Sequence, residues 1–169
     1  MKSISIIVPC FNEARNVANF YEAIMREQWR QISSNYEIIF IDDGSTDSTI
    51  AEIKKLQSID KNIRLVKFSR NFGKESAMLA GLKSAKNELI TVMDCDLQDP
   101  PSLLSQMIEI YNANVDSSGA GRVKMIVAKR KNRKGEGKIR AFFSEIFYKI
   151  NNALSSTKII SGVRDFRLM

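Results

Sequence analysis

The chain alternates short apolar runs with segments whose apolar residues recur at helical spacing, and this alternation constrains its fold more than any other feature. Five runs have the length and composition of buried strands. They are residues 3–8, 36–41, 63–68, 89–93 and 124–128. Helical spacing is found in residues 16–29, in a segment starting near residue 47, and in residues 76–86, 103–111 and 139–150. Repeated strand–helix alternation with short loops predicts an α/β protein with a mostly parallel sheet flanked by helices.

Polar side chains gather just after four of these predicted strands. The loops concerned are residues 9–13, 42–45, 69–74 and 94–101. The carboxyl ends of parallel strands meet at one edge of a sheet, where open α/β proteins bind their ligands. We therefore expect one ligand site built from these four loops.

Asp94 and Asp96 come directly after the apolar run 89–93. They lie two residues apart, so in extended backbone both side chains point the same way. Two carboxylates on one side suit Mg²⁺ or Mn²⁺, which keep coordination positions for water and substrate phosphates. The pattern therefore predicts a metal that clamps a diphosphate. The alternative is that Asp96 or Asp99 caps the helix that begins near Pro100.

Other residues at the first two strand ends suit a nucleotide. Asp43 is expected to accept hydrogen bonds from base or ribose, whereas Asp42 fits ligand contact and turn capping equally well. Glu13 fits either nucleotide contact or support of the first turn. Pro9 and Phe11 could shape a wall for a flat base.

The composition excludes several classes of enzyme. The sequence has no histidine, which excludes Ser-His-Asp and Cys-His catalysis and the usual His-containing zinc sites. A general base must then be a carboxylate, or the nucleophile must arrive ionised. Neither G-x-G-x-x-G after a strand nor G-x-x-x-x-G-K-S/T occurs, so a dinucleotide oxidoreductase or P-loop NTPase is not expected. Cys10 and Cys95 are too few for a disulfide scaffold, and each fits a buried strand end.

The net charge of +7 is concentrated in one segment. Residues 129–140 hold seven basic residues against Glu136 alone, and residues 139–150 carry a strong apolar face. We interpret 129–150 either as a solvated basic loop joined to a core helix or as a basic, amphipathic surface that lies on anionic lipid. Nucleic-acid binding is not expected, because exposed aromatic residues do not interleave with the basic ones.

Near the end of the sequence, residues 161–169 place Asp165 beside two arginines in a predicted glycine-led turn. The arginines could hold Asp165 ionised, as a base needs, or could bind a phosphate themselves. An ordinary surface ion pair is the third interpretation.

Five motifs of the chain resemble glycosyltransferase family 2, in particular the polyprenyl-phosphate sugar transferases of the dolichol-phosphate mannose synthase and bactoprenol glucosyltransferase types. They are IVPCFNE at residues 7–13, IDDGSTD at 41–47, SRNFGKE at 69–75, DCDLQDPP at 94–101 and DFRLM at 165–169. The resemblance implies one catalytic domain over residues 1–169 with a glycosyltransferase A fold. It also implies a nucleotide-sugar donor and a divalent cation, Mg²⁺ or Mn²⁺.

The resemblance implies a role for individual residues. The nucleotide-sugar contacts would be Pro9, Phe11, Glu13, Ile41, Asp43, Asp94, Cys95, Gln98 and Arg130. Asp94 and Asp96 correspond to the metal-binding aspartates, and Arg130 to an arginine that binds the diphosphate. Asp165 corresponds to the acidic residue proposed as the catalytic base. Phe11 departs from the family pattern, which often has tyrosine there.

The implied reaction moves a sugar from a nucleotide sugar, UDP- in preference to GDP-, to a polyprenyl phosphate with inversion. Such a phosphate is already mostly ionised near neutral pH, so it hardly needs a base. Family members continue into further core residues and usually two transmembrane helices, so we expect this chain to be C-terminally incomplete. Its expected place is the cytoplasmic face of a membrane, with residues 129–150 facing the bilayer, and a homo-oligomer is compatible with the family.

Without a tether, the chain itself is expected to stay soluble in the cytoplasm, because no apolar run approaches the roughly 18 residues of a membrane span and no signal-peptide pattern is present. Two other functions remain open. One is a soluble family 2 enzyme that glycosylates a saccharide or protein hydroxyl. The other is a non-catalytic module that binds a nucleotide or a membrane.

Overall fold

The structure, a computed structural model, describes residues 2–114, 125–129 and 163–169. The chain divides into a larger unit of residues 1–126 with 165–169 and a smaller unit of residues 127–164. All residues that line the pocket described below belong to the larger unit. The helix predicted over residues 139–150 lies outside the described residues.

Parallel strands form the body of the sheet in the larger unit. They are β1 (Lys2–Cys10), β2 (Ser33–Asp42), β3 (Ile63–Lys67) and β4 (Leu89–Val92). β1 pairs with β2 and β4, and β2 pairs with β3, which gives the spatial order β3-β2-β1-β4. β6 (Val163–Leu168) pairs antiparallel with β4. The mostly parallel sheet confirms the prediction from the alternating pattern.

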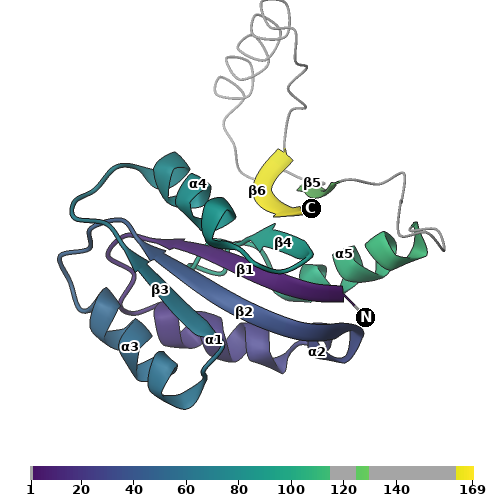
Figure 1. Ribbon diagram of the computed structural model, residues 1–169, viewed down its shortest axis with the longest axis horizontal. Coiled ribbons are helices and arrows are strands. Elements are labelled where there is room, and N and C mark those ends of the chain that lie inside the picture. Colours follow the sequence, from purple (N-terminus) through teal and green to yellow (C-terminus); the bar gives the residue numbers. More distant parts are fainter. Residues whose placement is uncertain (1, 115–124, 130–162) are drawn as a thin grey trace, which may run out of the picture. The chain divides into compact units, whose positions relative to one another are not determined.

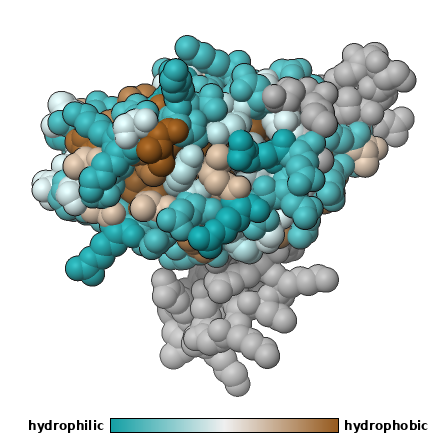
Figure 2. Space-filling view, turned by 90° about the horizontal axis from the view of Figure 1, so that it is seen from below, coloured by the Kyte–Doolittle hydropathy of each residue, from teal (hydrophilic) through white to brown (hydrophobic). Residues whose placement is uncertain are grey.

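Helices cover both faces of this sheet. α1 (Val17–Arg26), α2 (Trp29–Ile32) and α3 (Thr49–Ile59) lie on one face, and α4 (Lys74–Ser84) lies on the other (Figure 1). α5 (Ser102–Ala113) packs against α2. In the described part of the chain, the helices are too short or too polar to traverse a lipid bilayer. Seen from below, the surface is mostly hydrophilic, with a local hydrophobic area (Figure 2).

Successive residues of the central strands face opposite helix layers. Ile39 and Ile41 are fully buried with Ala77 of α4, whereas Phe40 meets Phe20 of α1 edge to face, with ring centroids 6.1 Å apart. Burial of each such side chain contributes on the order of 2 kcal/mol. Because both faces are covered, these strands appear in the sequence as continuous apolar runs rather than as alternating ones.

The single helix predicted over residues 16–29 is wrong, because the structure has two helices there. α1 ends at Arg26, and Glu27 is extended with φ −77° and ψ 154°. Trp29 begins α2 and is fully buried, and its indole N–H donates to the carbonyl of Ile24 at 2.7 Å. The indole thus pairs with one of the last carbonyls of α1 and helps to end that helix.

The turn predicted over residues 161–169 is also wrong, because the structure has strand β6 at Val163–Leu168. Phe166 and Leu168 are buried, and the backbones of Met169 and Ile90 exchange two hydrogen bonds of 2.7 and 2.9 Å. Burial of every second residue is typical of a strand. The turn was predicted from Gly162 at the start of the segment, and this alternation was overlooked. The remaining described strand, β5 (Ile126–Lys129), overlaps the run predicted at residues 124–128.

Candidate functional site

A pocket of about 320 Å³ opens at the carboxyl ends of the parallel strands. Loops that follow β1, β2, β3 and β4 all contribute to its wall, so the structure brings together the four polar loops of the sequence. The lining residues are Pro9, Cys10, Phe11, Glu13, Asp43, Asn71, Gly73, Lys74, Ala77, Asp94, Cys95 and Asp96.

Most of the predicted site residues that the structure describes line this pocket. Those at the pocket are Pro9, Phe11, Glu13, Asp43, Asp94, Cys95 and Asp96. Ile41 is instead fully buried in the core beneath α4, and Gln98 is exposed and bonds to Asp96. Asp165 lies in strand β6, but its side chain, like all of Arg130, is outside the described residues.

Asp94 holds the ammonium group of Lys74. The Lys74 Nζ lies 2.8 Å from Oδ1 and 2.9 Å from Oδ2 of Asp94. Both side chains are partly exposed, at 40% for Lys74 and 33% for Asp94. The contact joins the first residue of α4 to the loop that follows β4. Both residues line the pocket, and Asp94 is one of the two carboxylates predicted to bind the metal.

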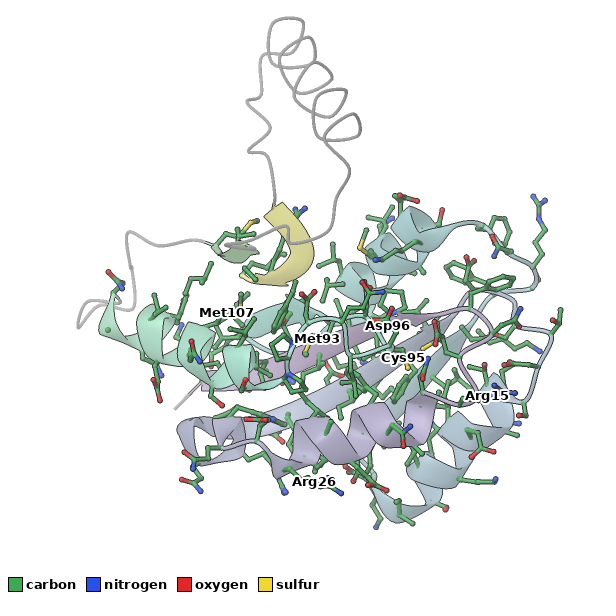
Figure 3. The ribbon with its side chains drawn as sticks, turned by 180° about the vertical axis from the view of Figure 1, so that it is seen from behind. Arg15, Arg26, Met93, Cys95, Asp96 and Met107 are labelled. Atoms are coloured by element: carbon green, nitrogen blue, oxygen red, sulfur yellow. The ribbon has the colours of Figure 1, made fainter. Side chains whose placement is uncertain are left out.

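Asp96 is fixed by the turn that follows it. Its Oδ1 accepts the backbone N–H of Gln98 at 3.1 Å, and its Oδ2 accepts the Gln98 side-chain amide at 2.8 Å. Between them Leu97 has a left-handed φ of 58°. Figure 3 shows Cys95 and Asp96 close together beyond Met93, at the loop after β4. The two bonds orient the Asp96 carboxylate, and the residue is exposed and lines the pocket.

Asp43 ties the end of β2 to the loop that precedes α4. The side chain is 4% exposed, and its two oxygens accept the backbone N–H groups of Phe72 at 2.7 Å and Gly73 at 2.9 Å. The neighbouring Gly44 has φ +74°, and a Cβ there would lie 2.4 Å from the carbonyl carbon of Arg70. The two loops therefore touch through their backbones, which only glycine allows.

The loop after β1 is held by the loop after β2. Asn12, at φ 57°, accepts the backbone N–H of Thr46 at 2.8 Å and donates its own N–H to Ser45 Oγ at 2.9 Å. Glu13 accepts the Asn16 side-chain amide at 2.5 Å and also lines the pocket, so turn support and nucleotide contact both stay predictions for it. Asp42 is fully buried and accepts the Ser45 N–H at 3.3 Å, which fits the turn-capping interpretation.

Two buried thiols form the floor of the pocket. Cys10 at the end of β1 and Cys95 between the two aspartates are each 2% exposed. A hydrogen bond with Cys95 raises the pKa of Cys10 well above its usual value, and burial and the nearby negative charges of Glu13 and Asp42 raise it further. Cys10 is therefore a neutral, structural thiol rather than a nucleophile.

The residues at the pocket fit a divalent cation. The described part of the chain has no cluster of three or more Cys, Asp or Glu side chains that could hold a metal by itself. Asp94 and Asp96 supply two hard oxygen donors beside an open pocket, and Mg²⁺ and Mn²⁺ are commonly held by one or two carboxylates together with water and substrate phosphates. Asp94 already binds a cationic group in this structure, the ammonium of Lys74.

Sequence reasoning placed the loop 69–74 at the site but gave Lys74 no role. Asn71 and Gly73 of the same loop also line the pocket. The available signal was a cation directly after a polar strand-end loop, at the start of the next helix. Its partner Asp94 is 20 residues away, so local spacing does not reveal the pair.

Comparisons with known proteins agree with this geometry. The model of the family described as glycosyl transferase family 2 matches residues 5–169. The putative glycosyltransferase CsbB of Bacillus subtilis (strain 168) is 40% identical over 166 residues, which are 98% of this chain and 47% of that protein. The prophage bactoprenol glucosyl transferase homolog of Escherichia coli (strain K12) is also 40% identical over 166 residues, 98% of this chain and 51% of that one.

Solved structures share the fold at low sequence identity. The mannosyltransferase PcManGT from Pyrobaculum calidifontis, solved in complex with GDP-Man and Mn²⁺, has a TM-score of 0.65 and 20% identity, covering 99% of this chain and 44% of its own. S. aureus TarS 1–349 has a TM-score of 0.62 and 20% identity, covering 81% of this chain and 38% of its own. These similarities confirm the predicted glycosyltransferase A fold.

The chain spans about half the length of the curated relatives it matches. The family model nevertheless covers nearly all of its residues, and the sheet order and strand-end pocket described above agree with that match. The chain therefore belongs to glycosyl transferase family 2.

Proposed function

We propose that this chain carries the donor site of a glycosyltransferase that moves a sugar from a nucleotide sugar to a polyprenyl phosphate, with a Mg²⁺ or Mn²⁺ ion and with inversion. UDP is favoured over GDP because several relatives of the chain are named bactoprenol glucosyl transferases. The observation that carries the proposal is one pocket at the carboxyl ends of parallel strands, lined by Asp94 and Asp96 together with Pro9, Phe11 and Asp43.

We assign a base end and a diphosphate end to the pocket. Phe11 is 45% exposed and offers an aromatic face to a flat base, with Pro9 beside it. Asp43 is engaged with two loop N–H groups, so a ribose or base donor would use its remaining lone pairs. Ile41 is fully buried and does not line the pocket, so we assign it no contact with the donor.

Asp94 and Asp96 would hold the divalent ion at the diphosphate end. When bound, the ion neutralises charge on the diphosphate and makes it a better leaving group. Cys95 and Gln98 belong to the same loop, on which we place the sugar end of the donor. We assign Arg130 to the diphosphate as well, since a guanidinium suits planar phosphate recognition.

The acceptor phosphate supplies its own nucleophile. An ionised oxygen of the polyprenyl phosphate attacks the anomeric carbon, and the bond from that carbon to the nucleoside diphosphate breaks in the same step. One displacement inverts the anomeric centre. Asp165 would act as a general base only for an acceptor that arrives protonated, such as a hydroxyl group.

We also propose that residues 129–150 face an anionic bilayer at the cytoplasmic side of the membrane. Seven basic residues within 129–140 support this, because each can gain up to about 1 kcal/mol near anionic lipid. In a flotation assay the chain should bind anionic vesicles. Neutralising Lys131, Arg133 and Lys134 together should weaken that binding, and unchanged flotation would contradict the assignment.

A transfer assay tests the proposed reaction. The chain is mixed with Mn²⁺, a panel of labelled nucleotide sugars and vesicles that contain polyprenyl phosphate. A parallel reaction offers saccharide and protein acceptors instead, and calorimetry measures nucleotide binding with and without Mn²⁺. Label should enter the lipid phase with inverted anomeric configuration by NMR. Asp94→Asn and Asp96→Asn should each lower transfer by about 100-fold. Glu109→Gln removes an exposed carboxylate of α5, away from the pocket, and should leave transfer unchanged.

Three results of this assay would contradict the proposal in different ways. Label on a saccharide or protein hydroxyl, abolished by Asp165→Asn, would identify a hydroxyl-transferring family 2 enzyme. A product with retained configuration would exclude the single displacement. Nucleotide binding that is indifferent to Mn²⁺, with no transfer to any acceptor, would indicate a non-catalytic binding module.

A further inference from the structure

The pocket that would receive a metal and a diphosphate contains its own cation. Of the described residues that line it, Lys74 is the only cationic one, whereas Glu13, Asp43, Asp94 and Asp96 are acidic. The Lys74 ammonium contacts both oxygens of Asp94, at 2.8 and 2.9 Å. One of the two carboxylates suited to the metal is therefore occupied by a protein cation in this structure.

The backbone that carries Lys74 is fixed in place. The preceding residues Phe72 and Gly73 donate their N–H groups to Asp43, and Gly73 has φ +96°, a conformation that side chains disfavour. The Ser76 hydroxyl donates to the Phe72 carbonyl at 3.0 Å on the other side. The start of α4 is thus held against the end of β2, which positions the Lys74 side chain at the pocket.

The Lys74 side chain itself is only partly enclosed. Its four-carbon stem is flexible, and its ammonium can donate hydrogen bonds in several directions. The side chain is 40% exposed. A monovalent ammonium and a divalent ion on the same carboxylate repel each other, because both are cations within a few ångströms. Arrival of the divalent ion at Asp94 therefore favours a second position for Lys74. The negatively charged diphosphate, which arrives with the metal, offers the ammonium a new anionic partner.

We propose that Lys74 is an exchangeable cation of the donor site. It neutralises Asp94 before the metal binds, and it transfers to the donor's diphosphate when metal and nucleotide are both present. The inference rests on the proposed function, which supplies both the metal at Asp94 and the diphosphate of the donor. Lys74 pairs with Asp94 when metal and nucleotide are absent, and it binds the diphosphate when both are present.

This exchange predicts effects of opposite sign on two affinities. Lys74→Met keeps most of the stem and removes the charge. Without its competitor, Mn²⁺ alone should bind about fivefold more tightly. Without its cation, UDP should bind about tenfold more weakly at saturating Mn²⁺. A residue that merely supported the fold would lower both affinities together.

The experiment measures Mn²⁺ alone by the electron paramagnetic resonance of the unbound ion, and UDP at saturating Mn²⁺ by calorimetry, both on the 169-residue chain. Lys83→Met is the matched control, because Lys83 is an exposed lysine at the other end of α4, outside the pocket lining. Its affinities should equal those of the wild type. Lys74→Arg, which keeps the charge, should recover most of the UDP affinity. Circular dichroism and thermal unfolding verify that each variant is folded.

Two outcomes would overturn the inference, and they are distinguishable. If wild type binds UDP with Mn²⁺ but Lys74→Met binds Mn²⁺ alone no more tightly, or binds UDP as well as wild type does, the exchange is refuted while the donor site stands. If wild type shows no Mn²⁺-dependent binding of UDP, the proposed function itself fails, and the exchange fails with it.

Discussion

The carboxylate of Asp43 holds the backbone N–H of Gly73 at 2.9 Å and thereby joins the loop after β2 to the loop before α4. The same carboxylate accepts the N–H of Phe72 at 2.7 Å. A residue that the sequence suggests as a nucleotide ligand is thus also the attachment point for the helix start that carries Lys74. Ligand contact and loop geometry are coupled at this position.

Asp43→Asn should therefore weaken stability and nucleotide binding together. The amide offers one oxygen to two N–H donors and turns an NH₂ group toward the other, so one part-buried N–H loses its bond to residue 43. We expect a loss of about 1–3 kcal/mol in the free energy of unfolding by urea titration, and a parallel loss of UDP affinity by calorimetry. Full stability together with lost UDP affinity would show that Asp43 acts on the ligand alone.

Alanine substitutions at Gly44 and Gly73 distinguish the cost of a strained φ from the cost of a steric clash with neighbouring backbone. Both have positive φ, but a Cβ at Gly73 would meet nothing nearer than Glu75 Oε2 at 3.7 Å, whereas one at Gly44 would lie 2.4 Å from Arg70 backbone. Gly73→Ala should cost about 2 kcal/mol of unfolding free energy from strain alone, and Gly44→Ala about 4 kcal/mol, because the loops must also move apart. Urea unfolding measures both. Equal costs would mean that the loops separate easily.

The elements whose signal is local were predictable from the sequence. The apolar runs around Ile7, Ile39 and Leu65 mark strands because helices cover both faces of the sheet. The loops of the site were predictable because parallel strands bring their carboxyl ends to one edge of the sheet. The end of α1 and strand β6 were missed, because Trp29 and Phe166 look like ordinary apolar residues until their tertiary partners are known.

The site was predictable as a set of loops but not as a set of contacts. Asp94 and Asp96 stand out by spacing, and both line the pocket. The pairing of Lys74 with Asp94 depends on how α4 packs over β1 and β2, and no pattern within the segments that carry the two residues encodes it. Ile41 was predicted as a nucleotide contact because it lies in a family motif, but its side chain is in the core.

Glu37 predicts how stability depends on acidity. Burial alone would raise the pKa of Glu37, but hydrogen bonds from Ser5, Arg64 and the Lys86 backbone outweigh it, so the pKa lies below its usual 4.5. A lowered carboxyl pKa contributes stability that is complete above 4.5 and is lost as the pH falls through the folded-state pKa.

Glu37→Gln should accordingly lower the free energy of unfolding at neutral pH by about 2 kcal/mol, less than for an enclosed pair because the Arg64 side chain is 35% exposed. The difference from wild type should shrink as the pH falls below 4.5. Urea titrations across this range measure it. Parallel curves for the two proteins would refute the assigned pKa shift.

Cys10 should resist alkylation in the folded protein. Its hydrogen bond with Cys95 and its burial hold its pKa well above the usual 9.0, so little thiolate is present at mildly alkaline pH. Iodoacetamide labelling followed by mass spectrometry should modify Cys10 slowly in the native chain and rapidly in urea. Labelling of native Cys10 at the unfolded rate would show that the pocket floor opens readily.

The central claim is that a divalent ion at Asp94 and Asp96 holds the diphosphate of the donor. Anomalous scattering from a crystal of this chain grown with Mn²⁺ and UDP tests it most directly. We predict a manganese peak about 2.1 Å from carboxylate oxygens of these two residues, with diphosphate oxygens completing its coordination. Bound UDP with no manganese between it and the two aspartates would contradict the account.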